Sequence, residues 1–494
     1  MSLKLVMILT ILASVLSFGY FFSQNLIVTY PDGMSHLMIA RRTCGHDPLQ
    51  LGNVWLWLPH ILLLPLVCYN NFLYSSGTAG SIIAMLSYVF ATAYIYKTVF
   101  ALTENKGAAF TGAFIFGANP NVLYMQSIPM TELLLLATTV ASTYYLIKWN
   151  QTRRDIYLLG SSFAVMLAVT TRYEAWIFFG GMLASLTYSI LSYKFGFWKA
   201  VAHLLFFAIL PGGAIAGWIA LNAVYFKDPL AFTRGEYAAP SNWVSVTEPF
   251  IGNLGIAFQT YLIATIHNVG LPILIMGCLA LIYFLVSTRL RPDAFVILVP
   301  LGIFPFFVAM LYLGQRPLHV EEVTGDLYNL RFALQMVIPA ALLIGYMARM
   351  KIITILVVVV MVAGILGSSR IITLDESIVF LLDNKTIKQD RVGYWFEAHY
   401  DEGSILMEVY GNEVALFRLG PVIEHVIWEG AYLKWDASLR DPKQQQIRWI
   451  YMRKGTGGLS DKVWKAFQEH PESLNNYRRV FQTNDVEIFR RDSG

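Results

Sequence analysis

The residues whose side chains are best suited to catalysis or binding follow the first apolar stretch of the chain. They belong to the segment Tyr30-Pro31-Asp32-Gly33-Met34-Ser35-His36, which continues to Arg41-Arg42. A carboxylate such as Asp32, placed at a membrane surface, can act as a general base on a hydroxyl group. Helix capping is the alternative role for Asp32, but capping does not explain an acid, an imidazole and two arginines on one apolar loop. We therefore predict a functional site here, with Asp32 as its catalytic base.

Other polar residues of this loop are candidates for substrate binding. His36 lies four residues after Asp32 and can share a helix face with it. Asp47 and His60 follow on the same loop. Arg42 can hold a phosphate, because a guanidinium matches two phosphate oxygens at once. The alternative for Arg41 and Arg42 is that they snorkel toward lipid headgroups.

Two further segments place charges at the ends of apolar runs. Glu132 opens an apolar helix that begins at Leu133, where an acid is also stabilised by the helix dipole alone. Thr171-Arg172-Tyr173-Glu174 separates two apolar runs by no more than a turn. Charges this deep in a membrane are functional candidates by default, so we predict that Glu132 is catalytic, that Arg172 belongs to the same site, and that Tyr173 and Glu174 bind substrate. A local ion pair between Arg172 and Glu174 is the alternative.

Later loops carry the remaining candidates. Arg234, His319 and Glu321 are candidates for lining the same cavity. Arg331 directly precedes an apolar run, which suits binding of an anionic headgroup, although a role as a membrane anchor is equally compatible with its position.

The elements that must position these residues divide the chain into two compositional parts. Residues 370–494 carry 36 charged side chains in 125 positions, whereas residues 1–369 carry 32. The whole chain is 56% hydrophobic and 14% charged, which excludes a soluble protein of ordinary composition. We predict a membrane-embedded part, 1–369, and a soluble α/β domain, 370–494. The sequence lacks a basic stripe with interleaved aromatics, so it does not indicate a nucleic-acid partner.

Basic loops predict the topology of the membrane part. If the run 55–73 does not cross the bilayer, four basic loops fall on the cytoplasmic side: 148–154, 194–199, 289–291 and 349–351. This run begins with Trp55 and Trp57 and carries Pro59 and Pro65, which favours a place at the interface. We therefore predict about eleven transmembrane helices with a cytoplasmic N-terminus. The first outer loop, 23–80, then carries juxtamembrane helices, and the C-terminal domain is extracytoplasmic.

Short apolar runs predict the structure of the C-terminal domain. Strands are expected over 404–410, 414–417, 447–452 and 486–489, and a helix over 461–468 with Asp461 in its first turn. The three cysteines, Cys44, Cys68 and Cys278, form no metal or disulfide framework. We expect them to be separate apolar residues, although Cys44 and Cys68 can pair if both face an oxidising compartment.

Taken in their order along the chain, the polar motifs of the membrane part resemble those of the GT-C superfamily of integral-membrane glycosyltransferases. The chain is most similar to the family of protein O-mannosyltransferases and bacterial aminoarabinose transferases. The resemblance rests on the Asp32 loop, on Asn119-Pro120 to Thr131-Glu132, on Thr171 to Glu174, and on Asn329-Leu330-Arg331-Phe332. Phe332 stands where the family often has Tyr.

The resemblance implies a specific activity. Family members transfer a sugar from a polyprenyl-phosphate donor with inversion, using the acid of the first outer loop as base, here Asp32. Arg172, Arg234 and Arg331 match the residues that bind the lipid phosphate, and the acceptor is a glycan, a lipid or a protein. Some members need a divalent metal such as Mg²⁺ or Mn²⁺, but no paired Asp-x-Asp or Glu-x-Glu lies near Asp32. The implied location is the plasma or inner membrane.

Two other functions fit the same composition. A flippase or transporter of lipid-linked saccharides also needs arginines facing a cavity, but transporters tend to show internal repeats and broken helices, and the sequence shows no convincing repeat between its halves. An oligosaccharide polymerase or ligase shares the design of the outer loops.

The topology makes the first testable prediction. A tag inserted at 150–154 should be reached by a membrane-impermeant reagent only after the membrane is opened, because this basic loop is expected in the cytoplasm. Labelling of that tag in intact cells would contradict the scheme.

Overall fold

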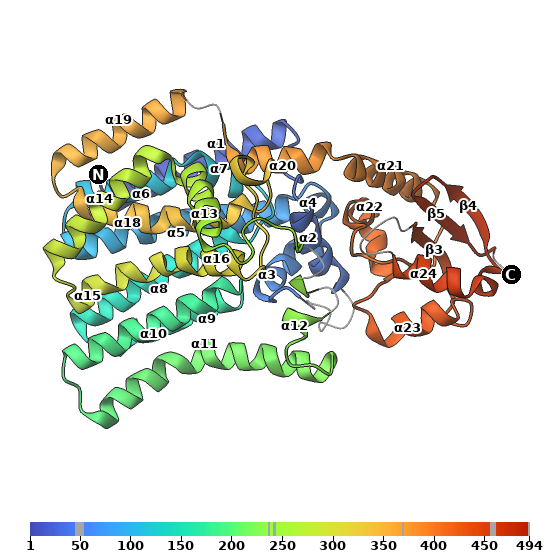
Figure 1. The fold of residues 1–494 in the computed structure, drawn as a ribbon, viewed down its shortest axis with the longest axis horizontal. Helices are drawn as coiled ribbons and strands as arrows, with labels where there is room; N and C mark the ends of the chain where they lie inside the picture. Colours follow the sequence, from blue (N-terminus) through green and yellow to red (C-terminus); the bar gives the residue numbers. More distant parts are fainter. Residues whose placement is uncertain (45–53, 236–237, 241–243, 368–369, 455–460, 493–494) are drawn as a thin grey trace.

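The computed structural model describes residues 1–494 except 45–53, 236–237, 241–243, 368–369, 455–460 and 493–494. A bundle of long helices forms one end of the molecule and a small sheet the other, with short helices between them (Figure 1). This arrangement confirms a polytopic helical protein with a C-terminal α/β domain.

Among the described residues, seven helical stretches are long and apolar enough to cross a membrane. They are α1 (Leu3–Ser23), α5 (Thr78–Thr103), α10 (Glu174–Ser192), α11 (Phe197–Tyr225), α14 (Leu271–Thr288), the stretch of α15 (Pro292–Phe295), η3 (Val296–Gly302) and α16 (Ile303–Tyr312), and the stretch of η4 (Leu330–Met336) and α18 (Val337–Met347). Four further helices complete the bundle: α6 (Lys106–Gly117), α8 (Glu132–Thr152), α9 (Asp155–Val169) and α19 (Lys351–Gly367). These four helices are not among the stretches that are long and apolar enough to span, so the number of eleven crossings stays a prediction.

The apolar run 259–286 differs from the single span expected from the sequence. It contains two helices, α13 (Leu254–Val269) and α14, which meet at Gly270 with a φ of 88°. Hydrogen bonds join the end of α13 to two other segments: the Asn268 amide donates to the Leu330 carbonyl, and the Asn119 amide donates to the Asn268 carbonyl. The break escapes hydropathy because both helices are apolar and the glycine between them is uncharged.

The segment between α1 and α5 folds into short helices. These are α2 (Pro31–Arg42), α3 (Leu58–Val67) and α4 (Asn71–Ser75). At 1.5 Å per residue, the ten residues of α3 reach about 15 Å, half of the roughly 30 Å of a bilayer core. The run 55–73 therefore forms no continuous spanning helix.

Short helices also join the later elements. They are α7 (Pro120–Met125), α12 (Ala231–Arg234), α17 (Glu321–Thr324), α20 (Ile372–Leu382) and α21 (Asn384–His399). Although α20 follows the last long helix, it packs against α7 and η4. The backbone N–H and hydroxyl of Thr373 both bond the Asn121 side-chain oxygen, and Ser377 bonds Tyr124. The link to the C-terminal domain is thus part of the helical body.

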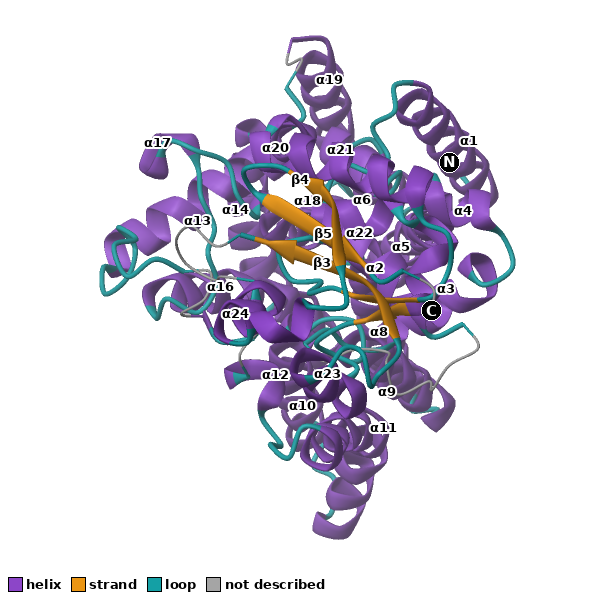
Figure 2. Ribbon diagram, turned by 90° about the vertical axis from the view of Figure 1, so that its right-hand side faces the viewer, coloured by secondary structure: helices purple, strands orange, loops and turns teal. Residues whose placement is uncertain are grey.

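The C-terminal domain is a five-stranded mixed sheet with helices, seen face-on in Figure 2. The strand order is β2-β1-β3-β5-β4, with β1 parallel to β2 and β3, and β5 antiparallel to β3 and β4. Ile405 pairs with Trp449, and Ile450 pairs with Phe489. The elements are β1 (Ser404–Leu406), α22 (Glu413–Arg418), η5 (Gly420–His425), β2 (Val426–Ile427), α23 (Tyr432–Arg440), β3 (Ile447–Arg453), α24 (Lys462–Glu469), η6 (Pro471–Leu474), β4 (Arg478–Gln482) and β5 (Val486–Arg490).

One strand expected in this domain is wrong and one is shorter than expected. The run 414–417 forms helix α22, and the strand expected over 404–410 ends at Leu406. Val414 to Phe417 are all buried, and a short apolar run that is buried on every side has no period that distinguishes helix from strand. The helix expected at 461–468 is present as α24, where the Asp461 carboxylate accepts the N–H groups of Val463 and Trp464.

A shared core ties the C-terminal domain to α2 and its neighbours. Met34 and Leu37 of α2 and Tyr74 of α4 pack in one cluster with Leu416 and Phe417 of α22. The ring centroids of Tyr74 and Phe417 lie 5.1 Å apart. Because this core is continuous, the position of α2 depends on the C-terminal domain as well as on the bundle.

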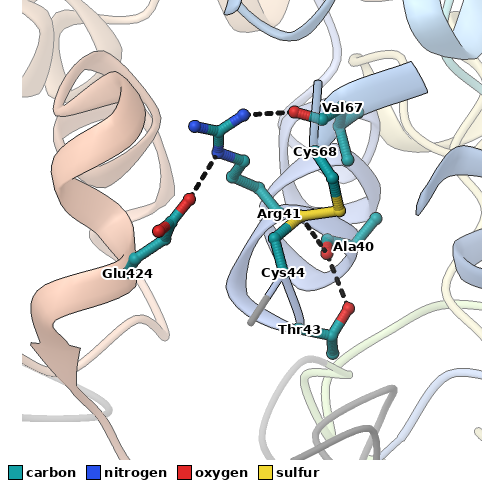
Figure 3. The surroundings of a disulfide bond; sticks show 7 residues. All are labelled: Ala40, Arg41, Thr43, Cys44, Val67, Cys68 and Glu424. Atoms are coloured by element: carbon teal, nitrogen blue, oxygen red, sulfur yellow. Dashed lines mark hydrogen bonds and ion pairs between the residues drawn. A yellow bond between two sulfur atoms is a disulfide. The ribbon is translucent and has the colours of Figure 1, made fainter. Parts of the chain in front are cut away.

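The end of α2 is held by a disulfide between Cys44 and Cys68 (Figure 3). The expectation that these cysteines stay separate is therefore wrong, because the contact between α2 and α3 brings their Cα atoms to 5.4 Å. Beside the disulfide, Arg41 donates to the Val67 carbonyl and forms an ion pair of 3.0 Å with Glu424 of the C-terminal domain.

Loss of this disulfide should destabilise the protein. A bond between cysteines 24 residues apart is worth about 3 kcal/mol through loop-closure entropy. We expect Cys44→Ser and Cys68→Ser to lower the thermal unfolding midpoint equally, whereas Cys278→Ser, at an exposed free cysteine, should leave it unchanged. Alkylation of Cys44 and Cys68 in the unreduced native protein would contradict the assignment.

Candidate functional site

Six charged side chains from separate segments form one connected network, which we call the charged network. Its members are Asp32, Glu132, Arg172, Glu174, Arg331 and Glu376. Asp32 is the second residue of α2, Glu132 and Glu174 are the first residues of α8 and α10, and Arg331 is the second residue of η4. An acid in the first turn of a helix is stabilised by the helix dipole. This preference explains why the network forms where these helices begin.

Arg331 is the centre of the network. Its guanidinium contacts Asp32, lies 3.2 Å from Glu132 and lies 3.5 Å from Glu376. The arginine side chain and those of Glu132 and Glu376 are buried. A buried guanidinium needs opposite charges around it, because leaving water costs several kcal/mol for each ion. Three carboxylates supply that compensation.

Arg172 extends the network toward the turn between α9 and α10. It lies 3.0 Å from Glu132 and 2.9 Å from Glu174, and it donates to the Thr131 hydroxyl at 3.1 Å. The local pair between Arg172 and Glu174 therefore exists, but Arg172 also reaches Glu132 on another helix. Glu132 thus bridges both arginines.

Asp32 differs from the other members in its exposure. Its side chain is 42% exposed, whereas Arg172 reaches 15% and the rest less. Asp32 opens onto a cavity of about 440 Å³, a size typical of small-molecule sites. Ser35, Ile39 and Arg42 line the same cavity and follow at three- and four-residue spacing on one face of α2.

The opposite wall of the cavity comes from the C-terminal part. The wall includes Asp383, Gln389, Val409, Tyr410, Gly411, Glu413, Trp428 and Glu429. Both Glu429 oxygens accept backbone N–H groups, from Val409 at 2.8 Å and Tyr410 at 3.0 Å, and Glu413 accepts the Gly411 N–H. These acids therefore fix the backbone of residues 409–411. Burial raises the pKa of Glu429 to about 7.

Arg42 is a buried cation that lines the same cavity. Its guanidinium stacks 3.7 Å from the centre of the Trp428 ring and is 3% exposed. Within the part of the chain that the structure describes, Arg42 makes no ion pair, and its Nη1 atom has no hydrogen-bond partner. Burial lowers the pKa of Arg42 to about 10, so it stays positively charged at neutral pH. A buried cation that no described carboxylate contacts, beside a cavity, is suited to an anionic ligand.

The remaining predicted residues lie elsewhere. His36 and His60 are buried against each other, with Nδ1 and Nε2 3.0 Å apart, and burial lowers the pKa of His36 well below its usual value. Tyr173 donates to the Val54 carbonyl and stacks on Phe232. Neither histidine lines the cavity; their contact joins α2 to α3.

The later loops form separate clusters. Arg234 is exposed and paired with Asp228 at 2.7 Å. His319 contacts Glu248 and Asp326, and Glu321 pairs with Arg370. Asp47 lies outside the described residues. The structure thus joins Asp32, Glu132, Arg172, Glu174 and Arg331 in one network, but not Arg234, His319 or Glu321.

Glu376 is a network member that the sequence did not reveal. Its two oxygens accept the backbone N–H groups of Asn329 at 2.7 Å and Leu330 at 3.0 Å. Asn329 has a φ of 56°, so Glu376 secures a left-handed residue directly before Arg331. Burial raises the pKa of Glu376 to about 7. No local pattern separates it from Asp375, which pairs with Arg370 at the surface.

The described residues do not form a metal site. No group of three or more His, Cys, Asp or Glu side chains among them is arranged to hold an ion. The carboxylates of Asp32, Glu132 and Glu376 instead converge on the Arg331 guanidinium.

Solved structures share this fold at low sequence identity. ArnT from Cupriavidus metallidurans bound to undecaprenyl phosphate is 10% identical, with 98% of this chain and 97% of that chain covered and a TM-score of 0.58. The oligosaccharyltransferase of Archaeoglobus fulgidus is 11% identical, with 91% and 69% covered and a TM-score of 0.53. No family model and no curated protein matches. The likeness shows that this chain shares the overall fold of these two proteins, as the resemblance of the sequence motifs predicts.

Removal of Glu376 should destabilise the site. Glu376→Ala leaves two buried N–H groups without an acceptor and removes one of the three carboxylates around Arg331, and breaking a buried pair costs about 3 kcal/mol or more. Asp375→Ala is the matched control, because an exposed ion pair contributes at most about 1 kcal/mol. Thermal unfolding of both purified variants checks this, and equal unfolding midpoints would contradict the role of Glu376.

Proposed function

We propose that this protein is a glycosyltransferase that moves a sugar from a polyprenyl-phosphate donor to an acceptor hydroxyl at the outer face of the membrane. The observation that carries the proposal is the position of Asp32. It is the exposed carboxylate of an otherwise buried charged network, and it opens onto the cavity between the bundle and the C-terminal domain.

Asp32 has the geometry of a general base. Arg331 holds one side of its carboxylate through Oδ2, while the exposed remainder of the side chain is open to a hydroxyl proton. As that proton moves to Asp32, the acceptor oxygen forms a bond to the anomeric carbon. The bond from that carbon to the phosphate oxygen breaks on the opposite side, and inversion follows. The polyprenyl phosphate leaves with the bonding electron pair.

Arginines stabilise the charge on the departing phosphate. Arg331 lies next to Asp32, and Arg172 is linked to Arg331 through Glu132, which contacts both arginines. Arg42 lies ten residues from Asp32, or about 15 Å along α2, and it offers a charge not consumed by an ion pair among the described residues. Arg234 forms an exposed pair with Asp228, so its contact with the phosphate stays a prediction.

An apolar cavity offers a place for the lipid chain. It has a volume of about 180 Å³ and is lined by residues of α8, α10, η3 and α18, among them Leu135, Phe178 and Ile338. Glu174 lines it and pairs with Arg172, so the charged network borders both cavities. A lipid tail here would bring its phosphate toward the arginines.

The sugar, the acceptor and the length of the lipid are left open by these contacts. The likeness to an oligosaccharyltransferase supports transfer of an oligosaccharide as the second candidate. A flippase would move the intact lipid instead. Radiolabelled polyprenyl-phosphate sugar in proteoliposomes distinguishes the two, because an enzyme passes label to an acceptor, whereas a flippase moves label across the bilayer without that transfer.

Replacement of Asp32 tests the mechanism. Asp32→Asn keeps the size of the side chain but removes the base, so transfer should fall by about 10²- to 10⁴-fold. Asp228→Asn, at an exposed acid paired with Arg234, should leave transfer unchanged. The two rates are compared by release of polyprenyl phosphate, with the unfolding midpoint as a check of folding. Full activity of a folded Asp32→Asn protein would exclude Asp32 as the base.

A further inference from the structure

A third cavity lies near the start of α1, at the end of the bundle away from the C-terminal domain (Figure 1). It has a volume of about 660 Å³ and is bounded by the start of α1, the ends of α5 and α8, and the start of α6. At the opposite end of α5, Gly80 packs against Pro129, near Glu132. Since 19 residues of helix separate Thr78 from Lys97, the cavity is about 28 Å from the level of the charged network.

Three lysines line this cavity: Lys97, Lys106 and Lys148. None of them forms an ion pair with any residue that the structure describes. Glu104 is the one acid in the lining, so the cavity carries an excess of two positive charges. Unlike the arginines of the charged network, these cations have no matching set of carboxylates.

Lys97 is placed inside an apolar helix. It lies six residues before the end of α5, or about 9 Å along the helix axis. A lysine within a membrane helix is costly and indicates a function by default. Its ammonium lies 4.7 Å from the centre of the Tyr94 ring and 5.9 Å from that of Tyr144. The ring faces hold the cation without neutralising it.

Lys148 is also held by an uncharged partner. Its ammonium donates to the Gln151 oxygen at 3.2 Å, and the Gln151 amide donates to the Ala101 carbonyl at 2.8 Å. The two ammonium groups are therefore positioned on different helices before any ligand arrives. Phe100, which is partly exposed, adds an apolar rim beside them.

We propose that this cavity binds a phosphate group, carried either by the headgroup of an anionic membrane lipid or by a soluble phosphate compound. Lysine ammoniums bind phosphate as point charges, and basic pockets between membrane helices bind phospholipid headgroups. The apolar rim and the depth of Lys97 favour the lipid. This site is independent of sugar transfer.

Binding by the purified full-length protein in a neutral detergent tests the proposal. The probes are short-chain phosphatidylglycerol, short-chain phosphatidylcholine and inorganic phosphate. We expect phosphatidylglycerol to bind more tightly than phosphatidylcholine, and more weakly as salt increases. Lys97→Gln and Lys148→Gln should each weaken binding about fivefold. Lys199→Gln is the matched control, because this exposed lysine also lies over an aromatic ring, that of Phe195, outside the cavity.

Each outcome decides the proposal. Lysine-dependent binding of phosphatidylglycerol alone supports the lipid source, and lysine-dependent binding of inorganic phosphate supports the soluble source. Equal binding by the Lys97→Gln, Lys148→Gln and Lys199→Gln proteins would overturn the site. Equal binding of phosphatidylcholine and phosphatidylglycerol would overturn its selectivity for anions.

Discussion

The guanidinium of Arg331 is almost fully buried and must be neutralised there, and that requirement organises the rest of the structure. Its carboxylate partners come from α2, α8 and α20, which are separated by 100 residues or more in the chain. Removing any one of them leaves charge uncompensated in a medium of low dielectric. The interaction therefore fixes the start of α2 against the bundle and brings the helix after the last membrane stretch back onto it. Because Arg331 holds one side of the Asp32 carboxylate, the other side faces the cavity in a defined orientation.

The C-terminal domain takes part in the same construction. It shares a core with α2 and α4, and its residues 409–411 and Trp428 form a wall of the cavity. The Arg41–Glu424 pair and the Cys44–Cys68 disulfide restrain the far end of α2, while Arg331 restrains its start. The helix that carries Asp32 is thus held at both ends by groups from other segments.

Much of this arrangement follows from local patterns in the sequence. The difference in charge density separates the bundle from the C-terminal domain. Asp32, Glu132 and Glu174 each stand at the start of a helix, which predicts that they lie at the same membrane surface. Long-range packing decides the rest. Glu376 and Asp375 are adjacent acids, and only the fold makes one a buried partner of Arg331 and the other a surface partner of Arg370. In the same way, pairing of Cys44 with Cys68 requires the contact of α2 with α3, and the helical state of Val414 to Phe417 depends on burial from all sides.

The wall that the C-terminal domain supplies has an evolutionary consequence. Side chains that face the cavity, such as Tyr410 and Trp428, can vary between related proteins without disturbing Asp32 on α2. Phe417 and Glu424, which join the domain to α4 and α2, are far less free to change. Diversification of ligand preference is therefore expected to proceed by substitution within the wall. Exchange of the whole domain between relatives would succeed only where both sides of this interface are exchanged together.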